Sequence, residues 1–185
     1  MTSTTSILSF SGRQGEGNCS SIAEYIRSEL TGKSKTIAHR LVEMNIRPCA
    51  KCRYECFGAD TKCPINDDVR TIYNTLFESH AIVFIIPVYS GAPSALYFSF
   101  RERAQGIFTD ELYDRYSTIP KHIIIIGNNN AGADNAVRFI ESEENNIKQL
   151  ILLQSHDYGL KSTDRNLLTN ETVCYRITAF TTNIM

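Results

Sequence analysis

The chain has 185 residues, 42% of them hydrophobic, which is enough for one domain with a sheet core covered on both sides. Nineteen basic residues nearly balance twenty acidic ones, and a net charge of −1 gives no overall field that attracts nucleic acid or an anionic membrane. The longest apolar run, Ala81–Val88, is far shorter than the ~20 residues of a membrane-spanning helix. We therefore expect one domain over residues 1–185, with neither nucleic acid nor a membrane as a partner.

Apolar runs rich in β-branched residues recur along the chain and predict strands that are buried on both faces. These runs are Ile7–Phe10, Thr36–Val42, Ala81–Tyr89, His122–Gly127 and Leu150–Leu153. The segments between them have apolar residues at helical spacing: Cys19–Leu30, Asp67–Ser79, Ser94–Ala104 and Ala133–Ile147. The alternation predicts right-handed βαβ units and an α/β fold with a doubly wound, five-stranded parallel sheet of order 2-1-3-4-5.

The segment after Ser155 does not show the long amphipathic helix that would complete such a fold. Val173, Tyr175 and Ile177 alternate with polar residues, which indicates a short strand instead. One face of the sheet would then lack a cover. We expect a second copy of the chain to supply it, in a homodimer or a homotetramer.

Three loops with unusual sequences follow the first, third and fourth strands. The first loop, Ser11–Ser20, has glycines for a tight turn, and its side chains and the next helix's N–H groups suit a phosphate. It lacks the lysine of a P-loop and the G-x-G-x-x-G spacing of a dinucleotide fold. The other two loops are Pro87–Pro93 and Gly127–Gly132. In a sheet of order 2-1-3-4-5 these strand ends meet at the switch point, which predicts a nucleotide-like cofactor there.

Four cysteines lie within the loop 48–66, after the second strand, at the spacing C-x2-C-x3-C-x6-C: Cys49, Cys52, Cys56 and Cys63. No export signal precedes them at Met1–Ser6, so we expect a cytoplasmic protein with reduced thiols and a metal site rather than disulfides. The spacing favours an iron–sulfur cluster. A structural zinc ion remains the alternative.

The order and spacing of these motifs resemble the NAD(P)H-dependent FMN reductases of flavodoxin-like fold. The resemblance runs from about Ile7 to Gly132 and rests on Ser11-Gly-Arg13, Asn18-Cys-Ser20, Ile46-Arg-Pro-Cys49-Ala-Lys-Cys52, Asp67-Asp68 and Pro87-Val-Tyr89-Ser-Gly91. The cysteine loop looks like that of the iron–sulfur flavoproteins. Two departures stand out: Arg53–Glu55 places three residues between the second and third cysteines where the family usually has two, and Cys19 stands where threonine is common.

The resemblance implies a set of binding residues. The FMN phosphate would be held by Ser11, Arg13, Asn18, Cys19 and Ser20. The isoalloxazine edge would be lined by Pro87, Val88, Tyr89, Ser90 and Gly91, and its other side by Asn128, Asn129 and Asn130. A [4Fe-4S] cluster would be ligated by Cys49, Cys52, Cys56 and Cys63.

The leading functional hypothesis is an iron–sulfur flavoprotein oxidoreductase with FMN and a [4Fe-4S] cluster. It would relay electrons from a reduced carrier such as ferredoxin, or from NAD(P)H as a transient donor, to a small-molecule acceptor. A first alternative is an NAD(P)H-dependent FMN or quinone reductase with a structural zinc loop. Two others are a non-catalytic flavin electron carrier and a metal-stabilised interaction module without flavin. We predict no catalytic acid–base residue in any of these cases.

Overall fold

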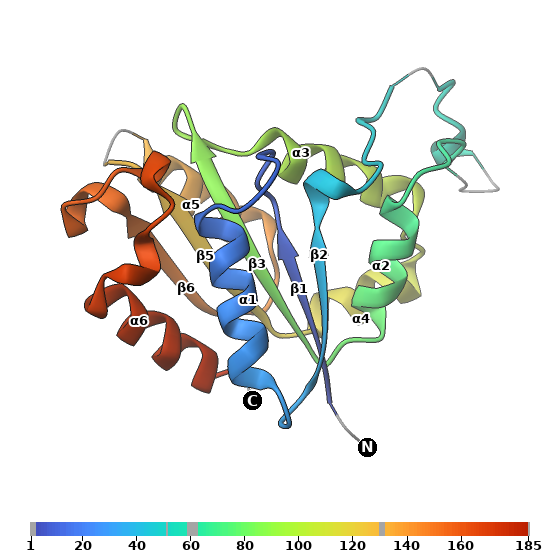
Figure 1. Ribbon diagram of the computed structural model, residues 1–185. Coiled ribbons are helices and arrows are strands. Elements are labelled where there is room, and N and C mark those ends of the chain that lie inside the picture. The colour runs from blue at the N-terminus through green and yellow to red at the C-terminus, as the bar shows by residue number, and fades with distance from the viewer. Residues whose placement is uncertain (1–2, 51, 59–62, 130–131, 185) are drawn as a thin grey trace.

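The computed structural model describes residues 3–50, 52–58, 63–129 and 132–184. Its strands are β1 (Thr4–Ser9), β2 (Lys35–Arg40), β3 (Ala81–Tyr89), β4 (Ala92–Pro93), β5 (Lys121–Gly127) and β6 (Ile147–Gln154). Five of the strands in this part of the chain run parallel in the order β2-β1-β3-β5-β6 (Figure 1). The prediction of a doubly wound parallel sheet is therefore confirmed, but the sheet has six strands in place of the expected five.

The sheet has a sixth strand, β4, that the sequence did not predict. It pairs antiparallel with the end of β3, where Val88 lies opposite Pro93. The two residues that join the strands, Ser90 and Gly91, have φ angles of 51° and 78°. Positive φ at both central positions is the geometry of the type I′ turn that closes two-residue hairpins. The segment 87–93 is thus a tight hairpin, not a simple connection from a strand to a helix.

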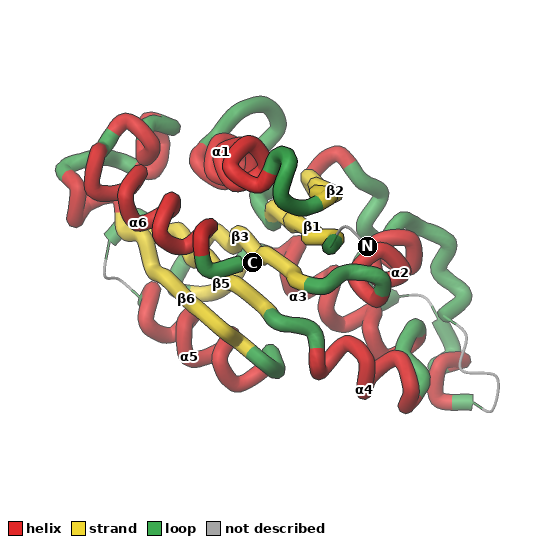
Figure 2. The backbone as a smooth tube through the Cα atoms, turned by 90° about the horizontal axis from the view of Figure 1, so that it is seen from below, coloured by secondary structure: helices red, strands yellow, loops and turns green. Residues whose placement is uncertain are grey.

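Helices cover both faces of the sheet (Figure 2). They are α1 (Asn18–Leu30), α2 (Val69–Phe77), α3 (Ala95–Glu102), α4 (Asp110–Thr118), α5 (Ala133–Glu143) and α6 (Glu171–Thr182). α1 and α6 pack on one face, and α2 to α5 pack on the other. The sequence predicted α1, α2, α3 and α5 but not α4. In the described part of the chain, no helix has the length and apolar character needed to cross a membrane.

Strand β3 divides the core into two layers. Ile82, Phe84 and Ile86 face α2 to α5, whereas Val83 and Ile85 face α1 and α6, and all five are fully buried. Side chains of a strand point alternately to the two faces of the sheet, so an uninterrupted apolar run is what a central strand needs. This is why the sequence located β3 correctly.

The predicted short strand near Val173 is wrong, because this segment forms helix α6. Val173, Ile177 and Phe180 form a buried stripe at helical spacing, while Tyr175 is 75% exposed. The side chain of Asn170 caps the helix by accepting a hydrogen bond from the Val173 N–H at 3.2 Å. α6 covers the sheet face beside α1. The homodimer or homotetramer was expected because the sequence indicated no cover for this face, and that reason no longer holds. The oligomer stays a prediction.

Candidate functional site

A cavity of about 380 Å³ lies at the carboxyl ends of β1, β3 and β5, a volume typical of small-molecule sites. Most of the residues predicted for the cofactor line it: Ser11, Arg13, Asn18, Cys19, Pro87, Val88, Tyr89, Ser90 and Asn128. Ser162 and Thr163, which follow β6, also line it and were not predicted. The only sequence signal for them was a pair of hydroxyl residues after the last strand of the sheet.

Three of the other predicted residues are placed differently, and a fourth is not described. Ser20 borders a small neighbouring hollow, and its hydroxyl is 2.9 Å from both the N–H and the carbonyl oxygen of Gly17, so it caps α1. Gly91 and Asn129 are not among the described residues that line the cavity. Asn130 lies outside the described residues.

Gly91 instead lies against Gly132, in the loop after β5. A Cβ atom built on Gly132 would lie 2.6 Å from the Cα of Gly91, far inside the distance that real Cβ atoms keep. Gly132 also has a φ of +81°, which disfavours any other residue. The hairpin after β3 and the loop after β5 therefore touch through their backbones, and this contact needs glycine.

The N-terminus of α1 faces this cavity with the N–H groups of its first turn. The first helical hydrogen bond of α1 runs from Ser21 N to the Gly17 carbonyl oxygen, so the N–H groups of Asn18, Cys19 and Ser20 have no carbonyl partner within the helix. The exposed Arg13 lies in the same loop. A cation and the N–H groups at the positive end of a helix dipole are suited to bind a phosphate.

Two of the predicted phosphate ligands have internal partners. The Asn18 side chain donates to the Ser162 carbonyl oxygen and accepts from Leu167 N, each at 3.2 Å, which ties α1 to the segment after β6. Cys19 is 5% exposed, and burial raises the pKa of its thiol to about 12. Asn18 thus positions the loops around the cavity, and Cys19 is a neutral side chain of the core below it.

The four candidate metal ligands, Cys49, Cys52, Cys56 and Cys63, all line a second cavity of about 190 Å³, beside the turn Arg103–Gly106 that follows α3. Cys49 is exposed and the other three are partly buried. Burial and then the neighbouring Cys52 thiol raise the pKa of Cys49. Among the described residues, no three cysteine, histidine or acidic side chains form a group that could hold a metal ion.

A buried ion pair closes the base of the cysteine loop. The side chains of Arg103 and Asp67 are 2% and 1% exposed, and Arg103 Nη1 lies 2.6 Å from Asp67 Oδ2. Arg103 also donates to the carbonyl oxygens of Arg47 at 3.0 Å and of Ile65 at 3.2 Å. Arg47 and Ile65 flank the cysteines in the sequence, so the guanidinium group of Arg103 joins both ends of the loop. Gly106 allows close packing here, because a Cβ on it would lie 2.6 Å from the Cβ of Cys63.

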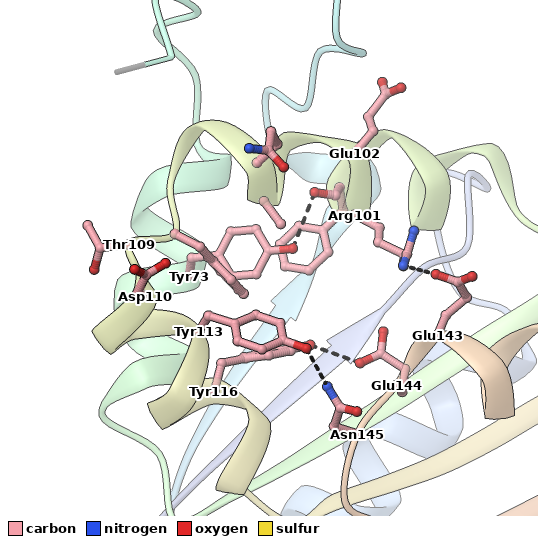
Figure 3. Close-up of a pocket in the computed structure, with 14 residues that line it drawn as sticks. Tyr73, Arg101, Glu102, Thr109, Asp110, Tyr113, Tyr116, Glu143, Glu144 and Asn145 are labelled. Carbon is pink, nitrogen blue, oxygen red and sulfur yellow. Dashed lines mark hydrogen bonds and ion pairs between the residues drawn. The ribbon is translucent and has the colours of Figure 1, made fainter. Parts of the chain in front are cut away.

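A third cavity, of about 490 Å³, lies between α3, α4 and the end of α5 (Figure 3). Its walls include Tyr73, Tyr113 and Tyr116, and no predicted site residue lines it. The buried Glu144 accepts hydrogen bonds from Tyr97 at 2.7 Å and Tyr116 at 3.1 Å, and burial raises its pKa. Glu102 and Gln105 line both this cavity and the cysteine cavity, which are therefore neighbours.

The sheet order and the cavity at its switch point define a flavodoxin-like α/β protein that can hold a nucleotide-like cofactor. The family model of the NADPH-dependent FMN reductases matches residues 5–137, and the chain belongs to this family. The protein is therefore a flavin-dependent NAD(P)H oxidoreductase, with FMN as the cofactor of its family. The resemblance seen in the sequence is confirmed. Family membership favours the two enzyme hypotheses over the non-catalytic carrier and the flavin-free module.

Solved structures share this fold at low sequence identity. An NAD(P)H:quinone oxidoreductase from Methanothermobacter marburgensis has a TM-score of 0.70 at 13% identity, over 99% of this chain and 96% of that one. An azoreductase from Bacillus anthracis has a TM-score of 0.67 at 11% identity, over 97% and 98%. The flavoenzyme NAD(P)H:(acceptor) oxidoreductase FerB from Paracoccus denitrificans has 0.60 at 13%, over 97% and 95%. No curated protein shows significant sequence similarity to the chain.

Proposed function

We propose that the protein is an iron–sulfur flavoprotein oxidoreductase, with FMN in the cavity at the strand ends and a [4Fe-4S] cluster in the cysteine cavity. The observation that carries this proposal is that Cys49, Cys52, Cys56 and Cys63 all line one cavity. When bound, FMN would exchange one or two electrons and the cluster would pass one at a time. NAD(P)H or a reduced carrier such as ferredoxin would be the donor, and a small molecule the acceptor.

The shape of the first cavity supports FMN binding. Arg13 and the N–H groups of the first turn of α1 would hold the phosphate. Pro87–Ser90, at the end of β3, would line the edge of the ring system, and Asn128 would lie on its other side. The Asn128 side chain accepts from Ser162 N at 3.1 Å, which connects this wall to the segment after β6. Ser162 and Thr163 would complete the site.

The sequence spacing of the cysteines, C-x2-C-x3-C-x6-C, favours a cluster over a single zinc ion. The four cysteines border one shared cavity. The segment Arg53–Glu55, which contains the extra residue, leads into the short 3₁₀ turn Glu55–Phe57. The loop accommodates the extra residue at this turn.

Helix α3 would set the distance between the two centres. It begins just after the hairpin that borders the flavin cavity and leads directly into the turn beside the cysteines. Its eight residues span about 12 Å. Ser94, which caps the helix, also donates to the Phe10 carbonyl oxygen at 2.7 Å and so fixes the start of α3 to the end of β1. The cysteine cavity is thereby held at a defined separation from the flavin cavity.

Analysis of anaerobically purified protein tests the proposal. We expect one FMN, about four iron atoms and about four acid-labile sulfides per chain, with visible absorption beyond the flavin bands that bleaches on reduction. Cys56→Ser should lose iron and sulfide but keep FMN. Cys174→Ser is the matched control, because Cys174 lies in α6 and donates to the Leu168 carbonyl oxygen. One zinc and no sulfide per chain would contradict the cluster and leave an FMN reductase with a zinc loop.

The electron donor is tested separately. Oxidation of NADH, NADPH and reduced ferredoxin is followed at steady state with quinone or free FMN as the acceptor. Turnover that requires ferredoxin and is lost in Cys56→Ser would support electron entry through the cluster. Turnover with NAD(P)H that is unchanged in Cys56→Ser would place the family's reductase activity on the flavin alone.

A further inference from the structure

The guanidinium group of Arg103 has one hydrogen-bond donor left over. An arginine carries five N–H donors, two on each terminal nitrogen and one on Nε. Nη1 donates to the Arg47 carbonyl oxygen and to Asp67, and Nη2 donates to the Ile65 carbonyl oxygen and to Asp67, so four donors have acceptors. The fifth, Nε–H, is buried and has no partner among the described residues.

An unpaired donor on a buried cation is unusual, because water cannot replace the missing acceptor. Arg103 is 2% exposed and is the arginine that lines the cysteine cavity in the described part of the chain. Cys63 lines the same cavity as Arg103, and the Cys63 N–H is held by the Gly106 carbonyl oxygen at 3.2 Å. The acceptor that Nε–H lacks is therefore expected on the side of the cavity where the sulfur atoms gather.

We infer that Arg103 Nε–H donates a hydrogen bond to a sulfur atom of the loaded cysteine site, at Cys63 or at a cluster sulfide next to it, and so sets the reduction potential of the centre. This inference rests on the proposed function. Sulfur atoms become more negative when the centre takes up one electron, so a hydrogen bond to them is stronger in the reduced state. Arg103 therefore raises the potential. It is a positioning residue that acts on the cluster without ligating it.

The test is Arg103→Lys, which keeps a positive charge opposite Asp67 but has no counterpart of Nε–H. The matched control is Arg101→Lys. Arg101 lies two residues before Arg103, pairs with Glu143 and borders the third cavity (Figure 3). We expect the midpoint potential of the cluster to shift downward in Arg103→Lys and to stay at the wild-type value in Arg101→Lys. Equal potentials in all three proteins, each with full iron and sulfide, would overturn the inference.

A second measurement needs no variant, in case Arg103→Lys does not fold. The reduced wild-type protein is grown with ¹⁵N-labelled arginine and measured by pulsed electron paramagnetic resonance. A hyperfine coupling between the cluster and an arginine nitrogen is expected, and its absence would refute the hydrogen bond. Iron and sulfide content separates the two proposals. A wild type without either contradicts the proposed function, whereas a loaded wild type without coupling contradicts only the role of Arg103.

Discussion

His122, in β5, is a buried histidine whose surroundings accept only its neutral form. Gln149 Nε2 lies 2.7 Å from the Phe180 carbonyl oxygen, which can only accept, so this atom is the amide nitrogen. The same nitrogen lies 2.7 Å from His122 Nδ1, which must therefore accept a hydrogen bond. Burial, and then the charge of Lys148, lower the pKa of His122 to about 4. Protonation would place two donors against each other in the core.

The lowered pKa makes the stability of the fold depend on pH. The folded protein keeps His122 neutral down to about pH 4, whereas the unfolded chain takes up the proton below pH 6.5. The stabilisation is therefore complete above pH 6.5 and is lost as the pH falls toward 4. Between pH 7 and pH 5 the loss from this group is about 2 kcal/mol, out of a total of about 3 kcal/mol.

The variant His122→Asn tests this reasoning, because its side-chain oxygen can accept from Gln149 and cannot be protonated. Urea unfolding is measured at pH 7 and pH 5. The wild type should lose about 2 kcal/mol more free energy of unfolding than His122→Asn over this range. His156→Asn, at an exposed position, is the control and should behave as the wild type does. The same loss in wild type and His122→Asn would refute the reasoning.

Two further predictions concern the flavin wall and the buried carboxyl group. Gly132→Ala places a Cβ 2.6 Å from the hairpin backbone at a φ of +81°, so we expect a loss of about 1–3 kcal/mol in stability and weaker FMN retention by fluorescence titration. Gly159→Ala, at positive φ in open space, is the control that keeps FMN. Tyr97→Phe leaves the buried Glu144 with one donor fewer and should cost about 1–3 kcal/mol in urea unfolding. The exposed Tyr113→Phe should cost much less, and equal losses would argue against a special role for the buried carboxyl group.

The sequence predicted the central strands well but not the last helix. β3 and β5 are buried on both faces, and their apolar runs have no other explanation. In α6, Val173 and Ile177 are four residues apart, a spacing that suits a helix and also an alternating strand. Phe180 and the capping Asn170 decide in favour of the helix, and both lie outside the short pattern that suggested the strand.

The candidate site was predictable where it depends on strand ends and less so where it depends on side-chain partners. The three loops meet at the switch point because parallel strands end at one edge of the sheet. Ser20 and Asn18 have the residue types of phosphate ligands, yet one caps its own helix and the other holds a distant segment. The role of each of these side chains depends on residues that are close in space but not in the sequence. The role of Arg103 depends on such residues too, because it meets the cysteines at the far end of α3.

The ion pair at the base of the cysteine loop makes that loop a closed ring on the surface of the fold, where it projects beyond α2 and α3 at the upper right of Figure 1. The ring is closed by Arg103 and Asp67, which lie outside the run of cysteines. Its length can therefore change without moving β2 or α2, since neither strand nor helix bears the strain of an insertion. A flavin enzyme built in this way can change this loop while its sheet stays the same.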